Sequence, residues 1–591
     1  HTEVLDDKLF DVGLALLREE SLDLASSSMS QARKNFIQDV GKYGDLRLKV
    51  VPILEARWEH LDQVRRSATT TIDLMVKPLL KLVTSSSPEV VDMSKNMFFE
   101  LLRAEFSSTR DFKHVGRHAV DAIDDIINSE TTAQHDGEAV ESQLLVLFRD
   151  DLAVRFDGDD LLNCTEAKRF LKETTELFGL LRALAIHPKN AEYEDERVYA
   201  YMKLMEFFDH LQRHDSYIKY AHMMSKELSA LGLHTEAASA LLLHARLLGC
   251  DTPRDPSTVS THGADAVAVE DLLEESIGVA PGCHGDCKGP RAHQVLDELD
   301  LGIIVFQEQT SLGRREKLYM QAIELLERGQ QWEMALQLAD TLRRQFSTVT
   351  FEYDKLSKLL LQCAAWYDQI MNVERFYPSV FRVGYYGKNY PPEIRNKEFV
   401  YRGAALEQII DFTARIKMKF PKHEMLPPKI TPGDEHRESE TYYLQISKLT
   451  PATRPEMTDQ PPASFVTDHR LPGNLRLWRS NNCVDTFFYT RPFNKRKQMG
   501  RPKSSNEFLD LWVEKRFVRT SRIYPGTQRR LQIMEQGTVF RNPIEMALES
   551  MVDKNAELEV KIKTMETLDD GGADQSYTMA LNGVVDAAVN G

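Results

Sequence analysis

The spacing of apolar residues changes twice along this chain, and these changes limit the folds that it can adopt. Up to about residue 372 apolar residues recur every three to four positions, as in "VVDMSKNMFFELLRAEF", which predicts amphipathic helices. Near residue 376 the period falls to two, and "SVFRVGYYG" places Phe381, Val383 and Tyr385 on one face of a strand. Helical spacing returns at Asn542. The sequence therefore predicts a mainly α fold with an antiparallel β domain between helical parts.

A length of 591 residues exceeds what one hydrophobic core supports, so several domains are expected. Helices that follow one another with short polar breaks predict a stack in which each pair buries its apolar stripe on the next. The expected segments are a helical region at 1–190, a helical lobe at 191–372 with an insertion loop at 250–300, a β lobe at 373–540, and the start of a second helical domain at 541–591.

Two local signals predict particular contacts within these segments. Residues 314–346 read as a helix–turn–helix hairpin, in which Trp332 packs against small residues such as Ala335, as in tetratricopeptide-type repeats. Asn542 is a suitable N-cap residue, with Pro543 at the first helical position and Glu545 placed to complete a capping box. A helix is therefore expected to begin at Pro543.

Composition narrows the class of protein. The net charge of −16 disfavours nucleic acid as a partner, and no apolar run approaches the ~20 residues of a membrane helix. Six scattered cysteines fit a reducing compartment. In "CHGDCKGPRAH" a flexible loop is the favoured interpretation, and the alternative is a zinc site. Its ligands would be Cys283, His284, Cys287 and His293. The first residue is not Met, so we expect a piece of a longer protein.

Signatures of catalysis are absent from the sequence. It contains no phosphate-binding loop, no Gly-x-Gly-x-x-Gly after a strand, no His-Glu-x-x-His and no Gly-x-Ser-x-Gly. No cofactor is therefore predicted. The basic run "RPFNKRKQMGRPK" (491–503) is either a solvated loop, which is favoured, or a contact for an anionic membrane or an acidic partner.

Longer strings are similar to those of a known family. These strings are "NMFFELLRAEFSSTRDFKHVGRHAVDAIDD", "HTEAASALLLHARLL", "FYPSVFRVGYYGKNYPPEIRNKEFVYRG" and "MALNGVVDAAVNG". They resemble the DOCK family of guanine-nucleotide exchange factors from about residue 40 to the end. Within that family the chain looks most like the Rac-directed branch that works with ELMO-type adaptors.

The resemblance implies a function without covalent chemistry. An armadillo-like repeat region would precede a helical lobe that forms a homodimer, a β lobe of two sheets, and a helical catalytic lobe that is truncated here. The last two lobes would grip a Rac-like Rho-family GTPase that controls the cytoskeleton, in the cytoplasm and after recruitment to the plasma membrane. An ELMO-type adaptor would bind through regions outside this chain. The alternative is a non-catalytic helical scaffold that recruits partners of the GTPase pathway.

The resemblance also assigns the nucleotide sensor. By motif match, "AVNG" identifies the sensor as Val589, with Asn590 and Gly591 forming a break in the helix. An apolar side chain beside the Mg²⁺ of the GTPase offers no oxygen ligand and excludes water, which weakens GDP binding. The alternative is that Val589 simply belongs to the apolar stripe of its own helix.

Further residues are candidates for contact with the GTPase. They are Tyr385, Lys388, Asn389 and Arg395 in the β lobe, and Asn582 and Val585 near the end of the chain. For Tyr385 the favoured alternative is a position in the core of the sheet.

Overall fold

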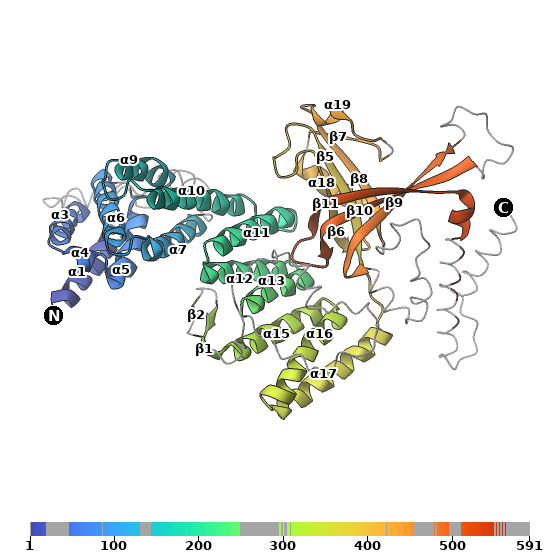
Figure 1. The fold of residues 1–591 in the computed structure, drawn as a ribbon, viewed down its shortest axis with the longest axis horizontal. Helices are drawn as coiled ribbons and strands as arrows, with labels where there is room; N and C mark the ends of the chain where they lie inside the picture. Colours follow the sequence, from blue (N-terminus) through green and yellow to red (C-terminus); the bar gives the residue numbers. More distant parts are fainter. Residues whose placement is uncertain are drawn as a thin grey trace, which may run out of the picture. The chain divides into compact units, whose positions relative to one another are not determined.

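The computed structural model of this chain divides into two compact units, residues 1–189 with 199–212 and residues 190–198 with 213–591. It describes residues 2–18, 46–85, 87–130, 144–248, 295–296, 299–300, 304–307, 309–420, 422–428, 430–452, 478, 481–495, 510–548, 551, 555, 558 and 562. The predicted class is confirmed, because helices dominate and an antiparallel β domain follows them along the chain (Figure 1).

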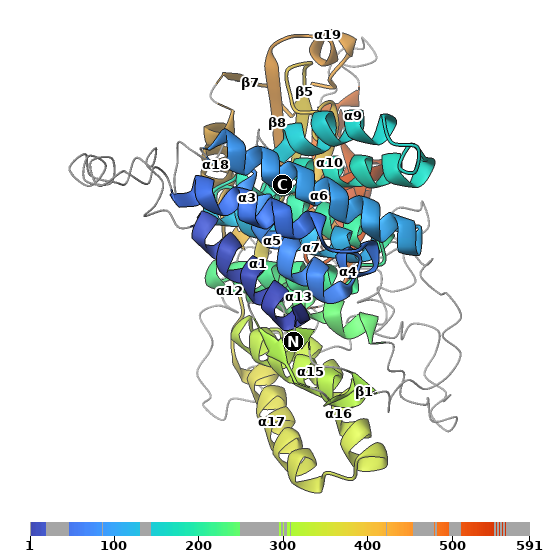
Figure 2. The same cartoon turned by 90° about the vertical axis from the view of Figure 1, so that its left-hand side faces the viewer.

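The first unit is entirely helical in its described residues. Its helices are α1 (Thr2–Arg18), α3 (Leu46–Glu59), α4 (Gln63–Arg66), α5 (Thr69–Leu82), α6 (Pro88–Thr109), α7 (Lys113–Glu130), the π-helical turn η2 (Leu147–Asp151), α9 (Leu152–Asp157), α10 (Thr165–Ala185) and most of α11 (Glu194–His210). Helix α5 packs against α1, α6 and α7 (Figure 2).

The spacing of residues explains this packing. On α5 the buried residues Ile72, Met75, Val76 and Leu79 recur every three to four positions, so one stripe meets the neighbouring helices. Helix ends are also joined, because the buried carboxylate of Glu105 on α6 accepts hydrogen bonds from the first backbone N–H groups of α7. That contact satisfies donors that a helix start leaves without partners.

The second unit begins with a stack of helices. They are α12 (His214–Ala230), α13 (His234–Leu247), α15 (Ser311–Arg328), α16 (Trp332–Arg344) with the π-helical turn η5 (Gln345–Val349), and α17 (Tyr353–Asn372). Each packs on the next (Figure 1). Trp332 and Ala335 are both buried at the start of α16, as the hairpin signal predicts.

Short strands lie beside this stack: β1 (Val295–Leu296) pairs with β4 (Gln309–Thr310), and β2 (Leu299–Asp300) pairs with β3 (Val305–Phe306). Phe306 is buried against the imidazoles of His222 on α12 and His244 on α13. Nε2 of His222 lies 3.0 Å from Nδ1 of His244. Two histidines thus share one hydrogen bond in an apolar environment.

The β domain is a closed sheet. Its strands are β5 (Pro378–Tyr386), β6 (Lys397–Ala405), β7 (His423–Met425), β8 (Tyr442–Ala452), β9 (Val484–Asn494), β10 (Leu511–Tyr524) and β11 (Arg530–Arg541), with α18 (Ile409–Lys419) and α19 (Asp434–Arg437) between them. The order is β5-β6-β11-β10-β9-β8-β7, and β5 also pairs with β8. Six antiparallel strands therefore close on themselves, which leaves few free edges, and β7 adds in parallel to β8.

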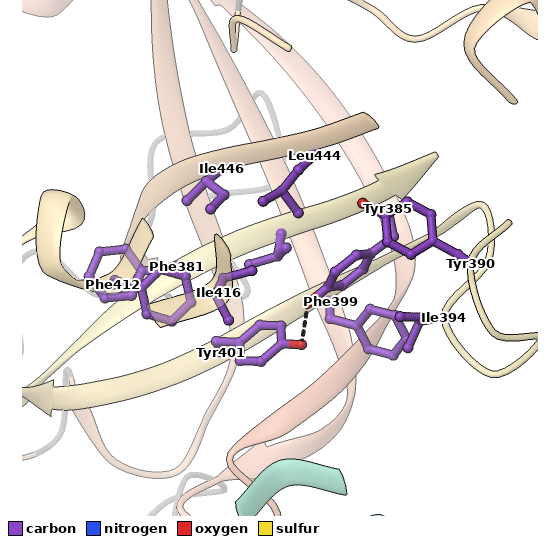
Figure 3. Packing of buried hydrophobic residues seen from close by; sticks show 11 residues of the cluster. Phe381, Tyr385, Tyr390, Ile394, Phe399, Tyr401, Phe412, Ile416, Leu444 and Ile446 are labelled. Atoms are coloured by element: carbon purple, nitrogen blue, oxygen red, sulfur yellow. Dashed lines mark hydrogen bonds between the residues drawn. The ribbon is translucent and has the colours of Figure 1, made fainter. Parts of the chain in front are cut away.

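The two faces of β5 serve different cores. Phe381, Val383 and Tyr385 share one face, as predicted, and pack with Phe412 and Ile416 of α18 (Figure 3). The opposite face carries Val380, in a second core with residues of β9, β10 and β11. It also carries Arg382, which forms a bidentate ion pair with Glu398 of β6. Because side chains alternate along a strand, one face of β5 packs against α18, and the opposite face packs against other strands of the sheet.

The predicted capping box after β11 is confirmed. The backbone N–H of Asn542 donates to the Glu545 carboxylate, and the N–H of Glu545 donates to the Asn542 side chain, both at 2.9 Å. Helical residues follow from Pro543.

The histidine pair predicts a dependence of stability on pH. Burial lowers the pKa of His222 to about 4, and burial with the nearby charges of His222 and Arg314 lowers that of His244 to about 3. Between pH ~6.5 and ~4 the unfolded chain binds protons that the folded pair does not. We expect the free energy of unfolding to fall by up to about 1.4 kcal/mol per pH unit for each histidine as the pH falls through this range.

Chemical denaturation at pH 7.5, 6 and 5 measures this slope. The control is His222→Gln with His244→Gln, which retains hydrogen-bonding groups but removes the basic nitrogens. The variant should lose less stability on acidification than the parent chain does. Equal slopes for the two proteins would contradict the prediction.

Candidate functional site

The turn between β5 and β6 brings three of the predicted contact residues together. It begins at Gly387, whose φ of +126° disfavours any residue with a side chain. A Cβ atom there would lie 2.2 Å from the carbonyl oxygen of Thr441, so the turn passes too close to its neighbour for any other residue. The Gly387 N–H donates to the Asn396 side chain at 3.1 Å, which joins the two ends of the turn.

Each of the three residues is exposed but also anchored. The backbone N–H of Lys388 donates to the carbonyl of Ser439 at 2.8 Å, and Nδ2 of Asn389 donates to the carbonyl of Glu440 at 2.6 Å. Nε of Arg395 donates to the carbonyl of Tyr390, at the other side of the turn. The turn therefore holds its polar side chains at the surface on a backbone that the neighbouring segment fixes.

Tyr385 does not share this surface. Its side chain is 2% exposed, and its hydroxyl lies 2.6 Å from that of Tyr401 (Figure 3). Burial raises its pKa well above the ordinary value. The prediction of Tyr385 as a contact residue is corrected, because α18 covers this face of β5 and the buried side chain cannot reach a partner. Tyr385 instead belongs to the core of the sheet, which is the favoured alternative.

The remaining predicted residues lie outside the described part of the chain. This holds for Asn582, Val585, Val589, Asn590 and Gly591, for the candidate zinc ligands between 283 and 293, and for nearly all of 250–300. Of the basic run 491–503, residues 491–495 are described.

A second cluster joins the start of α11 to the β domain through charges. Glu194 accepts a bond from Arg529 at 3.1 Å, and Glu196 accepts from Lys419 at 2.8 Å and from Arg530 at 3.2 Å. Burial raises the pKa of Glu194 to about 8. Burial also opposes ionisation of Glu196, but Arg530 and Lys419 outweigh it and lower the pKa of that carboxyl.

The same arrangement recurs at two other helix starts. Glu236, in the first turn of α13, accepts a bond from Arg402 of β6 at 2.7 Å, and both side chains are buried. Glu333, in the first turn of α16, forms a bidentate pair with Arg375, just before β5, at 2.6 and 2.7 Å. Three helix starts thus hold the β domain through carboxylates, which the positive end of a helix also favours.

Sequence reasoning did not identify this cluster. Its signals are local and ambiguous: "EDE" (194–196) opens a helical run, and "RR" (529–530) opens a strand. Nothing in either string indicates that residues 335 positions apart meet.

The two sites differ in exposure, because the turn 387–396 carries exposed polar side chains whereas the charge cluster is buried. Among the described residues no group of three or more His, Cys, Asp or Glu could hold a metal ion. No helix in the described ranges has the length and apolar character needed to cross a membrane.

Comparison with known proteins finds one matching family model and several related proteins. Residues 3–138 match the family described as "Dedicator of cytokinesis (DOCK) TPR region". Human dedicator of cytokinesis protein 3 is 26% identical over 98% of this chain, which covers 26% of that protein. Human dedicator of cytokinesis protein 4 is 26% identical over 99% of this chain, which again covers 26% of it. DOCK-like protein 1 of Saccharomyces cerevisiae is 23% identical over 48% of this chain and is covered to 14%. The chain thus spans about a quarter of the length of dedicator of cytokinesis proteins 3 and 4.

The buried pair Glu236–Arg402 predicts a large loss of stability when one partner is removed. In Glu236→Gln the Arg402 guanidinium would stay buried without its counter-charge. We expect the free energy of unfolding to fall by about 3 kcal/mol, measured by chemical denaturation at pH 7.

The exposed pair Lys388–Glu438 is the matched control. Its side chains are 55% and 67% exposed, with N and O 2.9 Å apart. Glu438→Gln should change the free energy of unfolding by less than about 1 kcal/mol. Similar losses in the two variants would show that burial does not decide the effect.

Proposed function

We propose that this chain of the DOCK family is part of a guanine-nucleotide exchange factor for a Rac-like Rho-family GTPase. The observation that carries this proposal is the similarity to dedicator of cytokinesis proteins 3 and 4, which extends over nearly the whole chain. At 98% and 99% of this chain it takes in the β lobe. The activity is release of GDP from a partner, which requires no nucleophile or cofactor in this chain.

The proposed mechanism uses one apolar side chain. Val589 would enter the nucleotide site of the GTPase, where Mg²⁺ bridges the phosphates within a demanding shell of oxygen ligands. Valine supplies no oxygen, and its branched side chain is stiff, so the ion and its waters are excluded and GDP binds less tightly. Linkage requires the converse, that a bound nucleotide with Mg²⁺ weakens the grip of the exchange factor by the same free energy.

The turn 387–396 would supply a further contact in this proposal. Lys388, Asn389 and Arg395 present two positive charges and an amide on a backbone that is fixed at both ends. Exposed charges at the rim of an interface mainly accelerate association and set its dependence on salt. Asn582 and Val585 are proposed to contact the GTPase beside the sensor.

A fluorescent-GDP release assay with the intact protein tests the proposal against a panel of Rho-family GTPases. We expect acceleration for Rac-like members. Val589→Ala should slow release at least about tenfold while binding to the nucleotide-free GTPase persists, because the sensor acts on the metal rather than on affinity. Lys388→Glu with Arg395→Glu should instead reduce the association rate, most strongly at low salt.

Two matched variants serve as controls. Val584→Ala makes the same truncation at a valine five positions earlier in the sequence, and Lys172→Glu makes a single Lys-to-Glu change at an exposed position of α10. Both should retain the parent rates. Parent rates in Val589→Ala would defeat the sensor assignment, and no acceleration with any GTPase would favour the non-catalytic scaffold.

We also propose that the helical lobe forms a homodimer through α17. This helix buries Leu359, Trp366 and Ile370 toward α16, but its other face is apolar and exposed. That stripe contains Tyr353, Leu360, Leu361, Tyr367 and Met371. An exposed apolar stripe at helical spacing on the last helix of a stack is typical of a docking surface.

Charges placed in the stripe test the dimer. Leu361 and Tyr367 are 71% and 61% exposed, so Leu361→Asp with Tyr367→Asp should preserve the fold. We expect light scattering at micromolar concentration to give a dimer for the parent protein and a monomer for the variant. Lys358→Asp, outside the stripe on the same helix, should remain a dimer. A monomeric parent protein would contradict the proposal.

We also propose that the protein is recruited to the plasma membrane, with the help of an ELMO-type adaptor. The described start of the basic run includes Arg491 and Lys495, and the Lys495 ammonium lies 3.3 Å from the ring centre of Trp512. Basic side chains beside an aromatic ring suit the surface of an anionic membrane. An ELMO-type adaptor would bind regions outside this chain and bring the protein from the cytoplasm to the plasma membrane.

A further inference from the structure

A pocket of about 310 Å³ lies where the starts of two helices meet the β domain. One wall is the turn 232–236, which opens α13, and another is the turn 329–331, which precedes α16. The segment 375–378 and the end of β6 at 402–405 close the other sides. Its size suits a small molecule rather than a peptide.

Three arginines line this pocket, and they differ in their contacts with carboxylates. Arg375 has two carboxylate contacts, both from Glu333. Arg402 is 7% exposed, donates to one carboxylate oxygen of Glu236, and lies close enough to Arg529 for their charges to oppose each other. Burial is the main cause that lowers the pKa of Arg402. Arg402 thus has one carboxylate contact, whereas Arg375 has two.

Arg529 lies at the pocket wall and contacts two acceptors. It donates to the Glu194 carboxylate at 3.1 Å and to the carbonyl of Gly403 at 2.5 Å. Burial disfavours the charged form of Glu194 and raises the pKa of this carboxyl to about 8. The lining itself contains three arginines and one carboxylate, that of Glu236.

Two helix starts and one imidazole ring also belong to the lining of the pocket. The N-cap residues of α13 and α16, Leu233 and Gln331, make no side-chain cap hydrogen bond, and the first turns of the two helices carry the carboxylates of Glu236 and Glu333. The buried Nδ1 atom of His234, also in the lining, has no hydrogen-bond partner. These groups accompany the arginines but would not make a site without them.

We propose that this pocket binds a small soluble phosphate, either inorganic phosphate or a short phosphate monoester. A guanidinium offers paired N–H donors that match phosphate oxygens, and such charge-assisted bonds are strong. The bound anion would contact α13, α16 and the end of β6 together. It would therefore reinforce the attachment of the β domain to the helical stack. The proposal is independent of nucleotide exchange and is measured without a GTPase.

Calorimetric titration of the full chain with inorganic phosphate, in chloride buffer at constant ionic strength, tests the proposal. We expect saturable binding and a matching rise in Tm. The double variant Glu236→Gln with Arg402→Gln removes both charges of the pair, and should weaken phosphate binding at least about tenfold. Arg343→Gln removes one positive charge at the other end of α16 and should bind as the parent chain does.

Two further arms keep the result interpretable. If the double variant does not fold by circular dichroism, His234→Ala replaces it, because that ring nitrogen has no partner to lose; the affinity should again fall. Glycerol 3-phosphate should bind, whereas vesicles that contain phosphatidic acid should not. Binding to the vesicles alone, heat and Tm changes equal to those of added chloride, or equal affinity in the pocket variants and the parent chain would overturn the proposal.

Discussion

The orientation of the β domain depends on buried ion pairs at the starts of three helices. Glu194 and Glu196 on α11, Glu236 on α13 and Glu333 on α16 each meet an arginine or lysine from the β domain or its entry segment. Removing such charges from water opposes most of their attraction, so they add less to stability than their number suggests. Their contribution is geometric, because a bidentate or hydrogen-bonded pair accepts one direction of approach, whereas an apolar contact accepts many. The helical stack therefore fixes the direction in which the β domain faces.

Within the β domain, side chains alternate between the two faces of β5, and each face packs within the domain. The face with Phe381, Val383 and Tyr385 lies under α18, and the opposite face holds Val380 and the Arg382–Glu398 pair inside the closed sheet. Both faces are thus occupied by the domain itself. In the proposed function recognition is assigned to the turn that follows the strand, where the backbone is anchored and the polar side chains face solvent. This division explains why Tyr385 belongs to the core while Lys388, three positions later, is exposed.

The sequence predicts those features that depend on local periodicity or on a short motif. The change of period at residue 376, the shared face of Phe381 and Tyr385, and the Asn542–Glu545 capping box are all confirmed. Periodicity shows which residues share a face but not what covers it, so the role of Tyr385 could not be settled from β5 alone; α18 decides it. The pairs Glu194–Arg529 and Glu236–Arg402 join residues far apart in the chain. No local pattern marks such partners, since each residue also reads as an ordinary exposed charge. The sensor at Val589 lies outside the described residues and rests on the family resemblance.

Exchange in the proposed function needs the turn 387–396 and the segment around Val589 to act on one GTPase at once. In the sequence the two are joined through β11 and the capped helix that begins at Pro543. The ion pairs hold β6 and the residues before β11 to the helical stack, and β6 in turn pairs with β11. A ligand that alters these pairs would therefore act on the sheet that carries the turn 387–396. In the proposed function the helical stack serves as the frame for that turn, and the exposed apolar face of α17 is the proposed contact for a second copy.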